Sequence, residues 1–309
     1  MKNEKSIILT YGLIGFVMVI WGLNVVMLKV LVEYLPPATM QSLRIFVAGL
    51  VVCAILFFQK QFRPLTKKEW KVTIITTLLG VVGHHLFLAI GLSMTTASNT
   101  SLILALLPLT TSLFALLLLN DQLTRLRLVG ICFGLVGVGL IILNGSGGVG
   151  SINYGDLFVF LAMLVQALSF IYIKKATATI DSKFMTGIML IIGSSMLFLI
   201  SLVLEPGGLG SVVNTPGYVW AIFFASAIVA TAIGHILFNS AIQRIGAGQT
   251  AVFNNFVPFF GLVSSAIFLG EQIMPVQMIG FVIIVFAVLL GTGYADDKIL
   301  RKVKKKQAA

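Results

Sequence analysis

The sequence predicts an all-α integral membrane protein with ten transmembrane helices, arranged as two inverted five-helix repeats. The prediction rests on composition, on the length of the apolar blocks and on an internal repeat. Of the 309 residues, 58% are hydrophobic and 10% are charged, and the mean hydropathy is +1.06. Soluble domains carry roughly 25% charged residues. This chain is therefore expected to be solvated mainly by lipid.

The apolar blocks are about twenty residues long, which at about 1.5 Å per residue crosses a hydrocarbon core of about 30 Å. Short connections such as EYLPP, NDQLTR and NGSGGVGSINYGD separate them and leave no room for a soluble domain. The first block is too long for a signal-peptide core and lacks a small-residue cleavage site, so we expect it to be retained. The expected helices span roughly 7–31, 37–58, 70–91, 97–119, 124–143, 155–176, 184–204, 217–240, 247–269 and 275–295.

An internal repeat relates the two halves of the chain. A shift of 150 residues places His85 on His235 and Pro108 on Pro258, and a shift of 145 aligns the first two helices of each half. Because five is an odd number, the second copy enters the membrane from the opposite side, and such inverted repeats underlie alternating access. We expect a first repeat at 1–145, a second at 146–297 and a basic cytoplasmic tail at 298–309.

Positive charge predicts the orientation in the cell membrane. With both termini in the cytoplasm, the Lys and Arg residues of the connections fall on the cytoplasmic side. The net charge of +11 is explained by anionic lipid headgroups rather than by nucleic acid, because the basic residues border helix ends. The outer loops are expected to carry only Glu33, Asp156, Glu205 and Glu271.

Two helices interrupted by proline are expected to face a central cavity. In the stretch AVFNNFVPFF, Pro258 cannot donate a backbone hydrogen bond, which leaves the carbonyl of Asn254 without its helical partner. Unsatisfied polar groups in hydrocarbon cost several kcal/mol, so Asn254 and Asn255 should face protein or water. The first copy repeats the design with Asn99 before Pro108. Both prolines are expected to soften their helices.

The chain resembles EamA-type members of the drug/metabolite transporter superfamily over essentially its whole length. The resemblance is carried by VIWGLNVVMLK in the first helix, ATMQSLRIFVAGL in the second, and the segment from AIGLSMTTASNTSLILALLPLTT to GICFGLVGVGLIIL, whose counterpart ends FLGEQIMPVQMIGFVIIVFAVLL. Asn120-Asp121 replaces the Gly-Glu pair that the second copy keeps at Gly270-Glu271. The resemblance implies an export-type carrier of small metabolites with a central path.

Polar side chains deep in the helices form the candidate substrate site. The histidines can relay protons, bind substrate or simply hydrogen-bond a carbonyl, and the asparagines can line a cavity or hold helices together. Arg44, deep in the second helix, requires a compensating partner. The predicted cavity residues are Trp21, Asn24, Arg44, His84, His85, Asn99, Gln166, His235, Asn239, Asn254 and Asn255.

Other charged residues have structural interpretations. Lys29 is expected to extend its amine to the headgroups, and Asp121 and Glu271 are expected to cap the helices that follow them. Three histidines without nearby carboxylates or thiols predict no metal site. No cofactor is expected, and Cys53 and Cys132 form no redox or metal spacing.

These observations favour a secondary transporter, an exporter of small neutral or zwitterionic metabolites such as amino acids. An enzyme would need paired carboxylates, a metal or an activated nucleophile at depth, and no acidic residue lies near the middle of an expected helix. A multidrug carrier of organic cations and a passive channel are the alternatives. A monomer or homodimer, driven by a metabolite gradient or by histidine-linked proton exchange, is compatible with the sequence.

Overall fold

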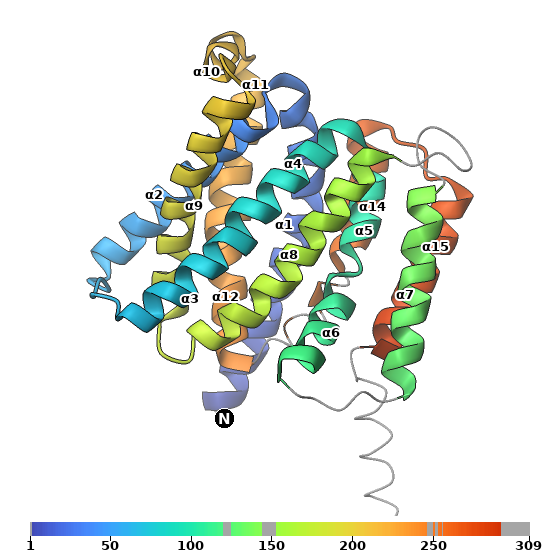
Figure 1. The fold of residues 1–309 in the computed structure, drawn as a ribbon, viewed down its shortest axis with the longest axis horizontal. Helices are drawn as coiled ribbons and strands as arrows, with labels where there is room; N and C mark the ends of the chain where they lie inside the picture. Colours follow the sequence, from blue (N-terminus) through green and yellow to red (C-terminus); the bar gives the residue numbers. More distant parts are fainter. Residues whose placement is uncertain are drawn as a thin grey trace, which may run out of the picture.

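The computed structural model describes residues 2–119, 125–143, 153–245, 250, 253–254 and 256–291, which form only helices, turns and short connections (Figure 1). Within these residues, seven helical segments are long and apolar enough to cross a membrane, and three further apolar helices are shorter. The all-helical membrane architecture is therefore confirmed. The count of ten spans and the inversion of the two halves remain predictions.

The first part of the chain contains five of its apolar segments. Two of them are interrupted: the third consists of α3, η1 and α4, and the fourth of α5 and α6. The elements are α1 (Lys2–Tyr34), α2 (Pro37–Phe58), α3 (Lys67–Thr77), η1 (Leu78–Gly83), α4 (His84–Met94), α5 (Ala97–Leu104), α6 (Leu107–Leu119) and α7 (Arg125–Leu143).

The second part also contains long helices and an interrupted one. Its third segment joins α11, η3 and α12. The elements are α8 (Tyr154–Ala176), α9 (Ser182–Leu204), α10 (Gly208–Ser211), η2 (Val212–Asn214), α11 (Gly217–Phe224), η3 (Ala225–Ile233), α12 (Gly234–Ile245), α14 (Phe256–Leu269) and α15 (Pro275–Gly291).

Local sequence signals set several helix ends. Helix α2 starts at Pro37, whose missing N–H is not needed in the first turn. Thr66 and Glu69 form a capping box at the start of α3. Asn153 and Asp181 accept backbone N–H groups at the starts of α8 and α9.

Both interrupted third segments contain a π-helical stretch that ends beside a histidine. Element η1 precedes His84 and His85, and η3 ends two residues before His235. The repeat shift of 150 residues carries η1 into the range of η3. Because π-helical turns distort the backbone and are frequent at functional sites, their position favours a functional role for these histidines.

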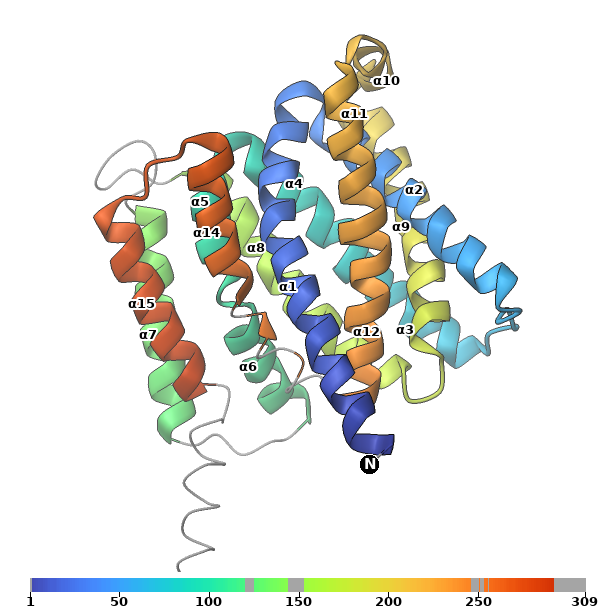
Figure 2. The same cartoon turned by 180° about the vertical axis from the view of Figure 1, so that it is seen from behind.

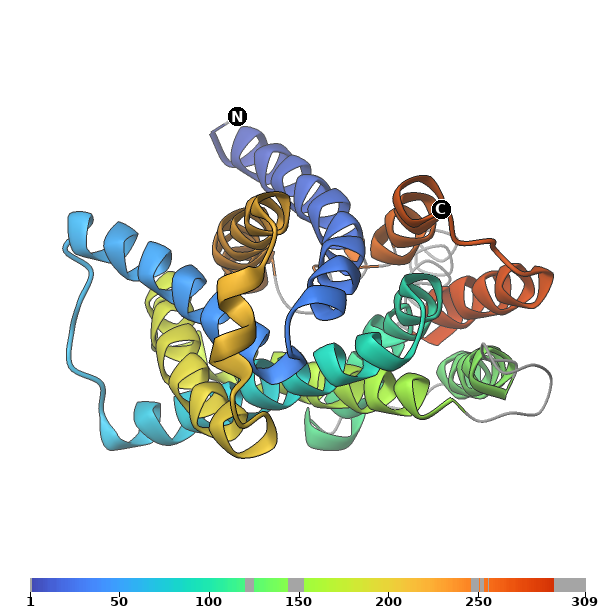
Figure 3. The same cartoon turned by 90° about the horizontal axis from the view of Figure 1, so that it is seen from above.

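The helices pack in pairs that join distant parts of the sequence. Helix α4 packs on α8, α2 on α9, α7 on α15, and α1 on α14, as Figures 1 and 2 show from opposite sides. Glycines permit close approach: a Cβ on Gly91 would lie 2.8 Å from the carbonyl oxygen of Gly155. Seen from above, α1 and α12 lie on one side of the α4 and α8 layer (Figure 3).

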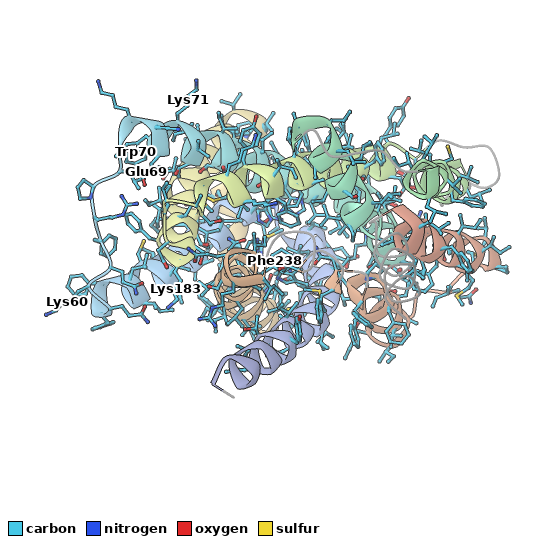
Figure 4. The ribbon with its side chains drawn as sticks, turned by 90° about the horizontal axis from the view of Figure 1, so that it is seen from below. Lys60, Glu69, Trp70, Lys71, Lys183 and Phe238 are labelled. Atoms are coloured by element: carbon cyan, nitrogen blue, oxygen red, sulfur yellow. The ribbon has the colours of Figure 1, made fainter. Side chains whose placement is uncertain are left out.

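The two ends of the bundle differ in charge. Lys60, Lys71 and Lys183 lie at the end seen in Figure 4, which we call the basic end. At the opposite, acidic end lie Glu205 and Glu271, in the connections that follow α9 and α14. This separation follows the charge pattern of the sequence; which end faces the cytoplasm remains a prediction.

The proline interruptions occur where they were expected, but the freed carbonyl is used differently. Helix α5 ends at Leu104 and α6 begins at Leu107, just before Pro108. The carbonyl of Asn254 accepts the N–H of Val257 at 3.1 Å, one residue before Pro258. The carbonyl lacks its α-helical partner, as expected, but it is not left free, because a tighter turn provides the N–H of Val257 instead.

Two structural interpretations of charged residues were also wrong, and that of Lys29 stays a prediction. Lys29 Nζ donates to the carbonyl of Leu92 at 3.1 Å and lies 3.9 Å from Glu33 Oε1, near the ends of α1 and α4. Asp156 is not in an outer loop but fully buried in the first turn of α8. Glu271 does not cap α15; it accepts the N–H groups of Ala97 and Ser98 at the start of α5. In each case a partner distant in sequence satisfied the group.

Candidate functional site: a central polar cavity

A cavity of about 90 Å³ lies among α1, α4, α5, α6, α8, η3, α12 and the start of α14. That volume exceeds the roughly 10–15 Å³ needed by one water molecule, so it can hold several waters or part of a small solute. Most of its wall is apolar. We call it the central cavity; it is lined by Trp21, Asn24, Val25, Leu28, His84, His85, Leu88, Leu104, Leu107, Gln166, Phe170, Ala230, Thr231, His235, Asn254 and Val257.

Three histidines supply both donors and acceptors to the central cavity. The rings of His84 and His85 lie 4.8 Å apart and those of His85 and His235 lie 5.9 Å apart. His84 Nδ1 lies 3.0 Å from the carbonyl of Ala162, and His235 Nδ1 lies 2.9 Å from the carbonyl of Thr231. A carbonyl only accepts, so both rings carry their proton on Nδ1 when neutral and leave Nε2 as an acceptor.

His85 has the opposite tautomer because of Arg44. The Nη2 of Arg44 lies 3.3 Å from His85 Nδ1, and a guanidinium can only donate. His85 Nδ1 must therefore accept, which places the proton of the neutral ring on Nε2. This Nε2–H group is buried without a hydrogen-bond partner among the described residues. It is a donor available to a ligand.

Arg44 lies behind the cavity wall and organises it. The side chain is fully buried; it donates to Gln41 Oε1 from Nε at 3.0 Å and from Nη2 at 2.6 Å. Its Nη1 donates to Ser226 Oγ at 3.1 Å and to Thr231 Oγ1. Ser226 in turn donates to Asn24 Oδ1 at 2.5 Å. Neutral oxygens thus compensate the buried charge, and Arg44 holds groups from α1, η3 and α4 in place.

Asn254 and Gln166 add unpartnered amide atoms. Asn254 is 3% exposed, and neither its Oδ1 nor its Nδ2 has a hydrogen-bond partner among the described residues. Gln166 Oε1 is likewise buried without a partner. Buried polar groups are nearly always hydrogen-bonded in folded proteins. Atoms of this kind beside a cavity therefore indicate that a ligand or water completes them.

Aromatic rings form part of the wall of the central cavity. Trp21 is the first lining residue along α1, and its ring lies 4.8 Å from that of Phe238. Phe238 also lies 5.3 Å from Phe170, and it is buried inside the bundle, near the middle of the view in Figure 4. Trp21 Nε1 donates to the carbonyl of Ala230 at 2.9 Å, which fixes the ring. These rings offer an apolar surface to the less polar part of a solute.

The structure brings together most of the predicted cavity residues but not all. Trp21, Asn24, His84, His85, Gln166, His235 and Asn254 line the central cavity. Arg44 lies behind it, and Asn239 lines a smaller neighbouring cavity. Asn99 is remote: it donates to Asp156 and accepts from Gln277 at 2.6 Å. Asn255 lies outside the described residues.

Thr231, Ser226 and Gln41 were missed by sequence reasoning. Serine and threonine in membrane helices commonly bond to their own backbone, as Thr76, Thr77 and Thr186 do here. Nothing in the local sequence separates Thr231 from them. The sequence indicated these three residues only indirectly, because the buried charge of Arg44 required hydrogen-bond partners somewhere in the fold. In the part of the chain that the structure describes, no group of three or more His, Cys, Asp or Glu side chains is suited to bind a metal ion.

Long apolar helices around a buried cavity with a few convergent polar groups define a multi-pass membrane protein with a small-molecule site. Comparisons with known proteins identify its family. A model of the EamA-like transporter family matches residues 8–143 and again residues 153–292. The chain belongs to the EamA-like transporter family.

Relatives agree with this assignment. The chain is 29% identical over 286 residues to the uncharacterized transporter YyaM of Bacillus subtilis strain 168, covering 91% of this chain and 92% of the relative. It is 22% identical over 291 residues to the uncharacterized inner membrane transporter YedA of Escherichia coli strain K12, covering 93% and 92%. A crystal structure with 17% identity shares the fold at a TM-score of 0.67, covering 92% of this chain and 97% of the other. The protein is thus a multi-pass membrane transporter of small molecules.

Proposed function

We propose that this protein exports small neutral or zwitterionic metabolites, with amino acids as the first candidates. The observation that carries the proposal is the set of buried groups at the central cavity: the Nε2–H of His85 and both amide atoms of Asn254 lack partners, and no carboxylate is among the described lining residues. Such a site can bind a carboxylate or carbonyl oxygen and an N–H group. An organic cation would find no opposite charge, and Arg44 nearby would repel it.

The same proposal covers the mechanism. Ten transmembrane helices in two inverted repeats, residues 1–145 and 146–297, would rock about the central cavity and expose it to each side in turn. Both termini and the tail at 298–309 would lie in the cytoplasm. Glu205 and Glu271 accept backbone N–H groups at the starts of α2 and α5, and Asp156 accepts from the side chains of Thr95 and Asn99. These structural roles support a carrier rather than an enzyme. Export would run down a metabolite gradient or exchange protons through the histidines.

Flux into proteoliposomes tests the substrate class. A panel of labelled amino acids, other neutral metabolites and a permanent organic cation is applied with and without a pH gradient. We expect saturable transport of neutral or zwitterionic compounds, accelerated when the vesicles hold unlabelled substrate, because counterflow is a property of carriers and not of channels. Saturable transport of the permanent cation alone would overturn the proposal.

The same vesicles separate the two energy sources. A response to the pH gradient that disappears in both His85→Ala and His235→Ala assigns proton exchange to the histidines. Ser195→Ala is a suitable control, since Ser195 is exposed on α9 and bonds only to the carbonyl of Ile191. A transport rate that does not depend on the pH gradient would instead indicate facilitated efflux.

A further inference from the structure

A second, smaller cavity adjoins the central cavity on the side of α9. It has a volume of about 10 Å³ and lies among η1, α8, α9 and α12. Gln166 and His235 line both cavities. The remaining lining residues of the second cavity are Gly80, Val81, Ser169, Ile173, Thr186, Met189, Leu190 and Asn239.

Three polar atoms of the second cavity have no hydrogen-bond partner among the described residues. They are Ser169 Oγ, Gln166 Oε1 and Asn239 Oδ1, from side chains that are 0%, 6% and 2% exposed. The orientation of Asn239 is determined by its neighbour. Thr186 donates its proton to the carbonyl of Ser182, so it can only accept from Asn239 Nδ2, at 2.8 Å, and Oδ1 of the same amide is an acceptor.

We propose that the second cavity binds one water molecule, held by Ser169, Gln166 and Asn239. The hydroxyl of Ser169 donates to the water oxygen, and the two water protons go to Gln166 Oε1 and Asn239 Oδ1. Every unpartnered atom is then satisfied. The volume matches one water, which needs roughly 10–15 Å³ and two to four polar partners.

A monovalent cation fits the second cavity less well. Its described lining residues include no carboxylate, and a buried ion without an opposite charge is strongly disfavoured. Arg44 already brings a positive charge against His85, whose ring lies 5.9 Å from that of His235. A neutral ligand avoids this repulsion.

The bound water also positions a group of the central cavity. A Cβ on Gly80 would lie 3.7 Å from Gln166 Oε1, so this oxygen faces the second cavity. Gln166 also lines the central cavity, so we infer that Nε2, on the other side of the amide carbon, is the atom that faces it. Water at Oε1 therefore fixes the amide so that it presents a donor to the solute, a consequence that rests on the proposed function.

Hydroxyl-radical footprinting of the purified full-length protein tests the water site without any transport assay. Bound water yields radicals next to Met189, which is 5% exposed and lines the second cavity. Met185, one turn earlier on α9, is 0% exposed and lines neither cavity. We expect several-fold more oxidation of Met189 than of Met185. Equal oxidation of the two would overturn the proposal.

Two variants make the result specific. In Gly80→Ala the new Cβ meets Ser169 Oγ and takes the space of the water, so oxidation of Met189 should fall to the level of Met185. Ser169→Ala adds no atom to the packed site and removes the hydroxyl that donates to the water, so it should also lower the oxidation of Met189. Ser194→Ala is the matched control, because Ser194 is equally buried but bonds to the carbonyl of Ile191; it should leave Met189 oxidation unchanged.

Two further measurements, of thermal stability in different salts and of transport, distinguish water from a cation and test the effect on the solute. The unfolding temperature is also measured in sodium chloride and in choline chloride. A higher value in sodium that is absent in Ser169→Ala would show that the second cavity binds a sodium ion instead of water, and would overturn the proposal. In proteoliposomes, Ser169→Ala should raise KM on the order of fivefold, as for one lost hydrogen bond, without changing the maximal rate. If the unaltered protein transports nothing in the panel, the proposed function fails while footprinting still decides the water site.

Discussion

Carboxylates at the acidic end are half-buried and polar groups around the central cavity are buried, and their hydrogen bonds differ in the opposite sense. At the acidic end, Glu205 accepts from Ala38 N, Thr39 N and Thr39 Oγ1 at 2.7–2.8 Å. Glu271 accepts from Ala97 N, Ser98 N and Ser98 Oγ at 2.5–2.9 Å. Both carboxylates therefore stabilise the N-terminus of a helix from a distant part of the chain.

Around the central cavity, the polar atoms that face inward have no such partners. His85 Nε2 and both amide atoms of Asn254 are buried and unpaired among the described residues. The hydrogen bonds of the acidic end stabilise the fold, whereas the unpaired atoms of the cavity reduce stability and leave binding capacity for a solute. Removing a group from each region should therefore have opposite consequences for stability and for transport.

The largest loss of stability is expected for Arg44, which connects the cavity wall to its surroundings. Arg44→Met leaves Gln41, Ser226, Thr231 and His85 buried without their donor, at about 1–3 kcal/mol for each group that finds no other partner. We expect a total loss of about 3 kcal/mol or more in the free energy of unfolding, measured by SDS titration of the purified protein.

Lys183→Met is the control for Arg44→Met. Lys183 is half-buried, and its Nζ makes one long, solvent-exposed contact to Gln59 Oε1 at 3.4 Å, so its replacement should change stability by less than about 0.5 kcal/mol. Equal stability of the two variants would show that the buried network around Arg44 does not hold the bundle together.

A smaller loss is expected at the acidic end. Glu271→Ala removes three hydrogen bonds from the start of α5 and should cost about 2 kcal/mol in the same titration. Glu271→Gln keeps an acceptor but not the charge, and should cost about half as much. Glu33→Ala, at an exposed position on α1, serves as the control. A cost for Glu33→Ala that matches Glu271→Ala would exclude the cap as the cause.

The sequence predicted the helices well because each is an apolar block of the length that a membrane requires. It also predicted which faces are polar, since Asn24 and Gln166 are isolated among apolar neighbours and Asn254 belongs to an asparagine pair in an apolar run. The repeat related His85 to His235. The π-helical turns of η1 and η3 could not be predicted, because stretches such as LLGVVG and ASAIVATAI are compatible with an ordinary α-helix. Tertiary packing selects the distortion.

The partners of charged residues were the least predictable part. Glu271 precedes α15 in the sequence, which suggests a local cap, yet the start of α5 lies closer in space. Asp156 follows a connection rich in glycine, which suggests exposure, yet Thr95 and Asn99 lie beside it after folding. Contacts over such sequence separations depend on how helices assemble, and one sequence does not encode that in a local pattern.

The smallest change in stability, together with a large change in transport, is expected for Asn254. Asn254→Leu replaces an amide without described partners by an apolar group of similar size, which should change the free energy of unfolding by about 0.5 kcal/mol or less, and can increase it. Because the same amide is proposed to bind the solute, flux in proteoliposomes should fall at least about tenfold.

Asn99→Leu is the matched comparison, since both asparagines precede a proline in an interrupted helix. Asn99 donates to Asp156 and accepts from Gln277, so its loss leaves a buried carboxylate and a buried amide unpaired and should cost about 2–3 kcal/mol. Its position remote from the central cavity predicts that the KM of the folded fraction stays unchanged. Stability lost in Asn254→Leu and retained in Asn99→Leu would reverse the comparison, and would mean that the central amide serves the fold and not the solute.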